Sequence, residues 1–228
     1  MRIFSALAVK EVVEPAAQAF TQQTGETFDN VFAPVGALVG KIAAGELADI
    51  AILIPPALET LHRDGKLAGR FDLGRVGIGI AIREGAKSPD FSTPEAFKEM
   101  LLNARSIALT DPAVGGTAGI YLAGLLDRMG IAEAIRPKVQ WQKNGFFSAQ
   151  AVARGDAELG MTQVSEIVAV KGAVVAGPLP EPLQSVTTYC AGIFTASKAQ
   201  DKARAFIETL LSPALHARWK AAGFELPG

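Results

Sequence analysis

The sequence predicts an α/β fold of two lobes, each built on a mostly parallel β-sheet flanked by helices. Short apolar strand patterns alternate with helical patterns through the first 70 residues, in the order β-α-β-α-β-α. This alternation is typical of parallel sheets with helices on both faces. Two longer strand patterns, residues 75–83 and 185–195, flank the middle third of the chain. A chain that leaves one lobe and returns through two such strands forms two lobes with a cleft between them. We therefore expect residues 1–78 with 190–228 in one lobe and 79–189 in the other.

The first third of the chain is expected to hold three strands and three helices. The strands are expected at residues 2–9, 27–34 and 48–55, and the helices at 10–24, 36–44 and 57–64. Each helical pattern is followed by a glycine that can end it, namely Gly25, Gly45 and Gly65. Five apolar residues of the first helix are expected on one face: Val12, Val13, Ala16, Ala19 and Phe20. Pro15 interrupts this helix, so we expect a kink or a start near Glu14.

The rest of the chain continues the alternation. A helix at 92–104 has Ser92 or Thr93 as its N-cap and Pro94 in its first turn. Further strands are expected at 105–111, 138–142, 157–164, 172–180 and 185–196, and further helices at 117–129, 144–154, 198–212 and 213–222. Ligands of parallel α/β sheets bind at the carboxyl ends of the strands, which here means loops 5–8 and 33–36.

The stretch Thr110–Leu126 (TDPAVGGTAGIYLAGLL) predicts a strand, a tight turn and a helix. Gly115 and Gly116 permit the turn, and Thr117 is expected to be the N-cap of the helix. The N–H groups and the positive dipole end of such a helix suit an anion. The alternative is a capped turn that binds nothing.

Composition excludes several classes of protein. The formal net charge of −1 gives no basic field for nucleic acid, and no apolar run approaches a membrane span of about 18 residues. One cysteine, Cys190, excludes an internal disulfide, and His62 and His216 lack metal-ligand spacing and are expected on the surface of helices. We expect no metal site and no cofactor. No hydrophobic leader precedes Ile3, so we expect a cytoplasmic protein as the sequence stands, or a periplasmic one if a signal peptide was removed.

Four segments in order carry a resemblance: IFSALAV, VFAPVGALVGKIAAGELADIAI, DPAVGGTAGIYLAGLLDRMGI and AVARGDAELGMTQ. In their order and spacing they resemble the periplasmic molybdate-binding proteins, a family of bilobal solute-binding proteins. The resemblance covers nearly the whole chain. It implies two α/β lobes joined by crossover strands, with an anion held between helix N-termini.

The residues that depart from this family's pattern concern the ligand. The resemblance places the family's two oxyanion-binding serines at Ala8 and Val35, and its binding tyrosine at Gln163. Each lost donor to a desolvated oxyanion costs about 1–3 kcal/mol, which argues against tight binding of molybdate or tungstate. Backbone donors at Ala118 and at the Asn144-Gly145 turn need no particular side chain. An apolar wall at Pro34 and Val35 favours a small organic acid.

Two functions follow from these residues. The first is a solute-binding protein for a di- or tricarboxylate, with an ABC transporter permease as partner if the protein is exported. The second is a cofactor-free isomerase, because aconitate isomerases are similar to molybdate-binding proteins. The residues expected to border the ligand are Ser5, Ala6, Pro34, Val35, Gly36, Arg75, Gly116, Thr117, Ala118, Asn144, Gly145 and Gln163.

Proton transfer in an isomerase needs a general acid or base. The candidates are Ser5, Lys10, Glu166 and Tyr189, with Cys190 also beside the expected cleft. The alternative roles are structural: a turn serine, a helix-start acid, a packed tyrosine and a small buried thiol. For Arg75, the alternative to ligand binding is a solvated side chain at the edge of a lobe.

Overall fold

The computed structural model describes residues 1–227 and divides into two compact units. Unit 1 comprises Met1–Arg75 and Thr187–Gly228, and unit 2 comprises Val76–Val186. The chain passes between them once within strand β4 (Leu67–Arg83) and once at the start of strand β9 (Val186–Phe194). Both strands fall on the long strand patterns of the sequence, although β4 begins eight residues before Arg75, where the sequence pattern places its start.

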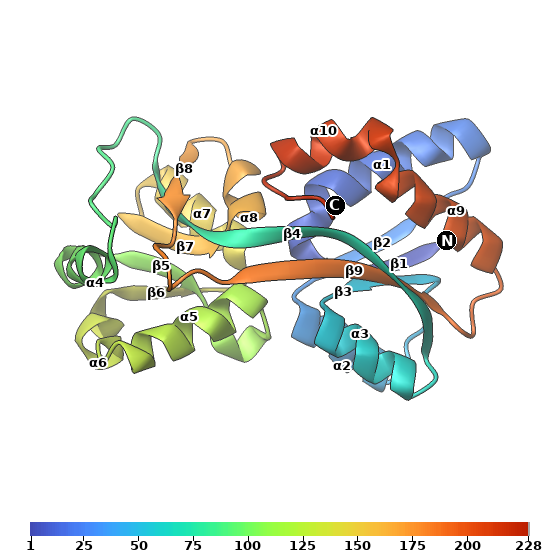
Figure 1. Ribbon diagram of the computed structural model, residues 1–228, viewed down its shortest axis with the longest axis horizontal. Coiled ribbons are helices and arrows are strands. Elements are labelled where there is room, and N and C mark those ends of the chain that lie inside the picture. The colour runs from blue at the N-terminus through green and yellow to red at the C-terminus, as the bar shows by residue number, and fades with distance from the viewer. Residues whose placement is uncertain (228) are drawn as a thin grey trace. The chain divides into compact units, whose positions relative to one another are not determined.

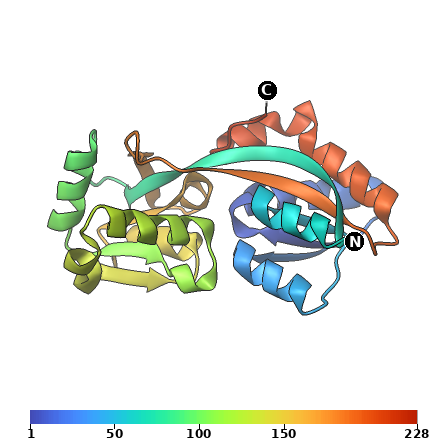
Figure 2. The same cartoon turned by 60° about the horizontal axis from the view of Figure 1, so that its bottom comes forward.

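Unit 1 is a five-stranded mixed sheet with helices on both faces (Figure 1). The strand order is β2-β1-β3-β9-β4, in which β1 pairs in parallel with β2 and β3, and β9 runs antiparallel to β3. Helices α2 and α3 cover one face, and α1, α9 and α10 cover the other (Figures 1 and 2). Besides β4 and β9, the elements are β1 (Arg2–Ala6), η1 (Leu7–Val9), α1 (Lys10–Thr24), β2 (Asp29–Ala33), α2 (Val35–Ala43), β3 (Ile50–Leu53), α3 (Pro55–Arg63), α9 (Gln200–Leu211) and α10 (Pro213–Ala221).

Unit 2 contains a second mixed sheet, in the order β4-β7-β5-β6, with β8 also paired to β4. Strand β5 is parallel to β6 and β7, whereas β4 is antiparallel to β7 and β8. The elements are α4 (Pro94–Asn103), β5 (Ile107–Thr110), η2 (Pro112–Val114), α5 (Thr117–Arg128), α6 (Ala132–Ile135), η3 (Arg136–Lys138), β6 (Val139–Gln142), α7 (Gly145–Arg154), β7 (Leu159–Gln163), α8 (Val164–Val168) and β8 (Ala173–Pro178).

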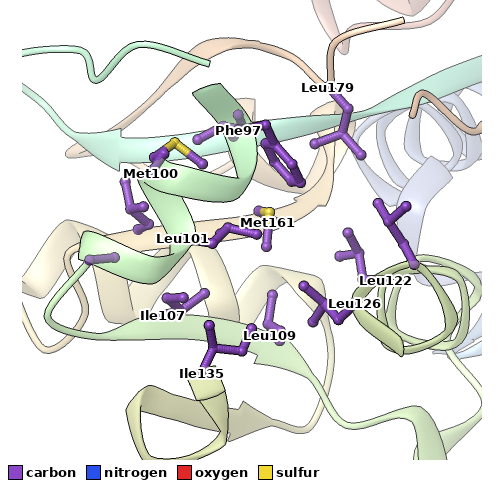
Figure 3. Close-up of a cluster of buried hydrophobic side chains, with 14 of the residues drawn as sticks. Phe97, Met100, Leu101, Ile107, Leu109, Leu122, Leu126, Ile135, Met161 and Leu179 are labelled. Carbon is purple, nitrogen blue, oxygen red and sulfur yellow. The ribbon is translucent and has the colours of Figure 1, made fainter. Parts of the chain in front are cut away.

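The two faces of the unit 2 sheet are packed with side chains of different size. On one face large side chains interdigitate, with Phe97 and Leu101 of α4 packed towards Leu109 and Met161 of the sheet (Figure 3). On the other face the buried residues are small, chiefly alanine and valine: Ala81, Ala108, Ala149, Ala151, Val152, Ala157, Ile167, Val170 and Ala173. Small residues let backbones approach closely. Helix α7 therefore lies close against the strands, which brings its first residue to the end of β7.

Several expectations for single elements are confirmed. Glycines with positive φ follow α1, α2 and α3 at Gly25, Gly45 and Gly65. Thr93 caps α4 by accepting a hydrogen bond from the Ala96 N–H. Both histidines are exposed on helices. No helix among residues 1–227 has the length and apolar character needed to cross a membrane.

Other expectations are wrong. Helix α1 runs from Lys10 through Pro15 without a late start, and its buried face includes Ala17 while Ala19 is exposed. The short helices α6 and α8 have no counterpart among the expected elements, because four or five residues are too few to display a helical period. Thr117 is not the N-cap of α5: the cap is Gly116 and Thr117 is the first helical residue.

Candidate functional site

In unit 1, the loops expected to hold a ligand begin side by side. The parallel strands β1 and β2 pair Ser5 with Phe32 and Ala6 with Ala33, so both strands end at the same edge of the sheet. The 3-10 turn η1 follows β1, and α2 follows β2 with Pro34 as its N-cap and Gly36 exposed in its first turn.

The side chains at this edge of unit 1 offer few polar groups. Ser5 is fully buried, and its hydroxyl donates to the Ala6 carbonyl at 3.2 Å. Ala8 and Val35, which stand where the resemblance places serines, are both buried. The Lys10 ammonium pairs with Glu14 at 3.7 Å and lies 5.7 Å from the centre of the Phe32 ring.

The remaining unit 1 candidates have structural contacts. Arg75 forms a two-nitrogen ion pair with Glu225, both distances being 2.8 Å, and both side chains are largely exposed. Tyr189 is buried and packs edge-to-face with Phe224 at 6.2 Å between ring centres. Burial raises the pKa of the Cys190 thiol to about 12, and its sulfur lies 3.5 Å from the Leu53 carbonyl. These contacts agree with the structural roles considered for all three residues.

In unit 2, the carboxyl ends of β5, β6 and β7 meet at one edge because the three strands are parallel. Helices α5, α7 and α8 begin from this edge. The Gln163 side chain, buried at the end of β7, donates from Nε2 to the Thr117 hydroxyl oxygen at 3.1 Å. This bond links two predicted site residues that are 46 positions apart. Ala118 is buried directly after Thr117.

The third strand end carries the Asn144-Gly145 turn. Asn144 caps α7 by accepting a hydrogen bond from the Phe147 N–H at 3.1 Å. The Gly145 N–H donates to the carboxyl of Glu166 on α8, as does the N–H of Gln163. The resemblance implies that the Gly145 N–H binds an external anion. In this chain the same N–H already has Glu166 as its acceptor.

Glu166 also accepts a hydrogen bond from the Thr162 hydroxyl, with 2.6 Å between Oγ1 and Oε2. Thr162 is fully buried, and Glu166 as a residue keeps partial exposure. Removal of the carboxyl from water raises its pKa to about 7, because desolvation outweighs the three hydrogen bonds that favour the ionised form. A carboxyl with this pKa exchanges its proton readily at neutral pH.

The fit around this carboxyl requires a glycine at position 145. A Cβ at Gly145 would lie 1.8 Å from Thr162 Oγ1 and 2.0 Å from Glu166 Oε2. Thr162 is the residue that the sequence analysis missed. The available signal was its position in the sequence: Thr162 lies directly before Gln163 and four residues before Glu166.

A cavity of about 770 Å³ lies elsewhere in unit 2, near the starting ends of β5 and β7. Its walls include Arg83, Lys87, Met100 and Arg105, and none of the predicted site residues lines it. Among residues 1–227, no group of three or more His, Cys, Asp or Glu side chains is placed to hold a metal ion.

Comparisons with known proteins agree with this fold. Residues 1–225 match the family model described as bacterial extracellular solute-binding protein. An aconitate isomerase from Pseudomonas sp is 33% identical over 220 residues, which cover 93% of this chain and 82% of the relative. The molybdate-binding protein ModA of Escherichia coli (strain K12) is 25% identical over 98% of this chain and 88% of its own length. The solved structure of the periplasmic molybdate-binding protein of Azotobacter vinelandii, 18% identical, superposes with a TM-score of 0.81 over the full length of both chains.

Proposed function

Since this chain belongs to the bacterial extracellular solute-binding protein family, we propose that it binds a small organic polyanion, a di- or tricarboxylate, in place of a tetrahedral oxyanion. The molybdate-binding fold and the relatives support an anion ligand. The identity of that anion depends on the donors that the chain offers.

This proposal rests on the residues found at three positions where the resemblance implies hydroxyl groups. Ala8 and Val35 are buried and apolar, and Gln163 has its amide bonded to Thr117. A desolvated oxyanion needs converging donors, and each missing donor costs about 1–3 kcal/mol. An organic acid has carbon atoms to place against Ala8 and Val35 and needs donors only at its carboxylates.

Unit 2 supplies groups suited to a carboxylate. The Thr117 hydroxyl accepts from Gln163, so its own hydrogen is free to be donated to an anion. The N–H groups of the first turn of α5 lie beside it and carry the positive end of the helix dipole.

We propose isomerisation of the bound acid as a second activity. It is favoured by the 33% identity to an aconitate isomerase over most of this chain, compared with 25% to ModA. The reaction moves a proton from the allylic CH2 of an unsaturated acid to the far carbon of its double bond, and the double bond shifts between them. No oxidant, water or metal is consumed in this step.

Proton NMR of cis-aconitate in D2O tests both activities in one experiment. Formation of the trans isomer with deuterium in the CH2 group, at catalytic amounts of protein and above a protein-free control, supports the isomerase. Line broadening of cis-aconitate at near-stoichiometric protein, without conversion, supports binding alone. Absence of both effects, together with micromolar molybdate binding by calorimetry, would contradict the proposal.

The family supports a further proposal about the partner and the compartment. We propose that the protein acts in the periplasm and, as a receptor, delivers its ligand to an ABC transporter permease. Fractionation of the native host, with an antibody against this chain, tests the location. Recovery only in the cytoplasmic fraction would contradict transport and leave the isomerase as the remaining activity.

A further inference from the structure

The carboxyl of Glu166 is held in one position by three donors from two segments of unit 2, strand β7 and the start of helix α7. The Thr162 hydroxyl donates to Oε2 at 2.6 Å from strand β7. The N–H of Gln163 donates from the end of that strand, and the N–H of Gly145 donates from the start of α7. All three donors are neutral, so no ion pair is among these contacts.

We propose that Glu166 is the residue that carries the proton in the isomerisation, and that Thr162 positions it. This inference rests on the proposed isomerase activity. It goes further by selecting one group from several candidates and by assigning a role to Thr162.

The other candidates lack the required features. Ser5 is fully buried and donates to its own strand, and no base is recorded at its hydroxyl. Lys10 is a cation bound to Glu14 and lies over Phe32. Tyr189 is 2% exposed and packs on Phe224. Glu166 differs from these residues in its carboxyl, which is removed from water, accepts a hydrogen bond from Thr162 and has a pKa of about 7.

The location of Glu166 also fits the role. Gln163, the last residue of β7, bonds to Thr117 at the start of α5, and its own N–H bonds to Glu166. The proposed carboxylate donors and the proposed proton carrier are thus connected through a single residue. The start of α5 and the Glu166 carboxyl thus belong to the same unit.

The proposed step balances without any co-reactant. The Glu166 carboxylate takes a proton from the allylic CH2, and the electron pair of the broken C–H bond forms the new C=C bond. The electrons of the old C=C bond then take the proton back from the Glu166 carboxylic acid at the far carbon. The enzyme returns to its starting state, and cis-aconitate becomes the trans isomer.

Thr162 positions the carboxyl and adjusts its proton affinity. A hydrogen bond donated to a carboxylate favours the ionised form. Removing this bond raises the pKa of Glu166, so the ionised fraction at neutral pH decreases. Since Thr162 is buried beneath Gly145, it acts through Glu166 and does not itself reach a ligand.

The test compares Glu166→Gln with the control Glu99→Gln, an exposed residue of α4 that the proposed site does not use. General acid–base catalysis contributes about 10²–10⁴-fold to a rate. We expect Glu166→Gln to lower kcat for cis-aconitate by at least about 100-fold, with the Kd for trans-aconitate changed less than about threefold, and Glu99→Gln to match the wild type. Near-UV circular dichroism verifies that both variants are folded.

A second pair of variants separates positioning from a purely structural role. Thr162→Val should move the acidic limb of the kcat against pH profile upward by at least about half a pH unit, and Thr162→Ser should restore it. A kcat of Glu166→Gln above about one tenth of the wild type, or an unchanged profile in Thr162→Val, would overturn the inference while wild-type activity still supported the isomerase. An inactive but ligand-binding wild type would overturn the isomerase and this inference together, and would leave carboxylate binding supported.

Discussion

In each unit several candidate residues lie at the carboxyl edge of a parallel strand pair, but their chemistry differs. In unit 1 two of these residues, Ala8 and Val35, are apolar and buried. In unit 2 several residues at this edge are polar and bonded to one another, as in the pairs Gln163 with Thr117 and Thr162 with Glu166. The difference teaches that similar edges of two sheets can differ in chemistry: the unit 1 edge offers few polar groups, and the unit 2 edge contains an internal acceptor, Glu166.

The Glu166 carboxyl leaves no room for a side chain at position 145, a steric requirement that unit 1 lacks at Gly40. We expect the largest loss of stability from a substitution that violates this requirement. Gly145→Ala places a Cβ within 2.0 Å of both Thr162 Oγ1 and Glu166 Oε2, so the carboxyl or helix α7 has to move. Overpacking of this kind costs about 3 kcal/mol or more. Urea unfolding measures the loss, which we expect to be accompanied by weaker carboxylate binding.

Gly40→Ala in α2 of unit 1 is the matched control. No atom lies within 4 Å of the added Cβ, and the glycine has helical backbone angles. Alanine is preferred to glycine within a helix by about 1 kcal/mol, so this variant should be slightly more stable than the wild type. Equal destabilisation by both substitutions would remove the steric distinction between the two edges.

The next largest expected effect is a dependence of folding stability on pH. The pKa of Glu166 is raised from 4.5 in the unfolded chain to about 7 in the folded protein. A raised pKa means that the folded state binds the proton more tightly, so this contribution to stability is complete below pH 4.5 and is lost as the pH rises through 7. Glu166→Gln cannot ionise and avoids that loss, which is on the order of 3 kcal/mol.

Thermal unfolding at several pH values measures this difference. We expect Glu166→Gln to be more stable than the wild type at pH 8.5 and equal to it near pH 4. Glu84→Gln, at an exposed position of unit 2, should show no such dependence. A wild type that gains stability over the variant as the pH rises would show that the hydrogen bonds to the ionised carboxyl outweigh its desolvation.

A smaller effect is expected where unit 2 is proposed to meet the ligand. Thr117→Val removes the hydroxyl that accepts from Gln163 and is proposed to donate to a carboxylate. The loss of one such bond costs about 1.4 kcal/mol, or tenfold in Kd for trans-aconitate by calorimetry. Thr60→Val, which removes an exposed hydroxyl bonded within α3, should leave the Kd unchanged.

The smallest effect is expected for Arg75→Ala. Its partner Glu225 and Arg75 itself are 69% and 60% exposed, and exposed ion pairs contribute about 0.2–1 kcal/mol. We expect a change in unfolding free energy below about 1 kcal/mol and no change in carboxylate affinity. A tenfold loss of affinity would instead assign Arg75 to the ligand, and would add a charged donor to the otherwise apolar group of unit 1.

Local sequence patterns were sufficient for most of the fold. Apolar periodicity and the glycines that end helices predicted every long strand and helix, because both signals depend on neighbours within a few residues. The same signals were ambiguous at strand and helix ends. The N-terminal half of β4 was not expected, since its exposed residues hide the apolar alternation, and no helix was expected at α8.

The candidate site shows what only the tertiary structure decided. From sequence, Thr117 was a cap because threonine is common at that position; in the fold its hydroxyl meets the Gln163 amide, 46 residues further along the chain. Glu166 was one of four candidates for proton transfer, and neither its contact with Gly145 nor its pKa follows from its neighbours in sequence. Residue types and their order determined the family. Desolvation and hydrogen bonding depend on which distant segments the fold packs together, so they determined which of the remaining polar groups has an altered proton affinity.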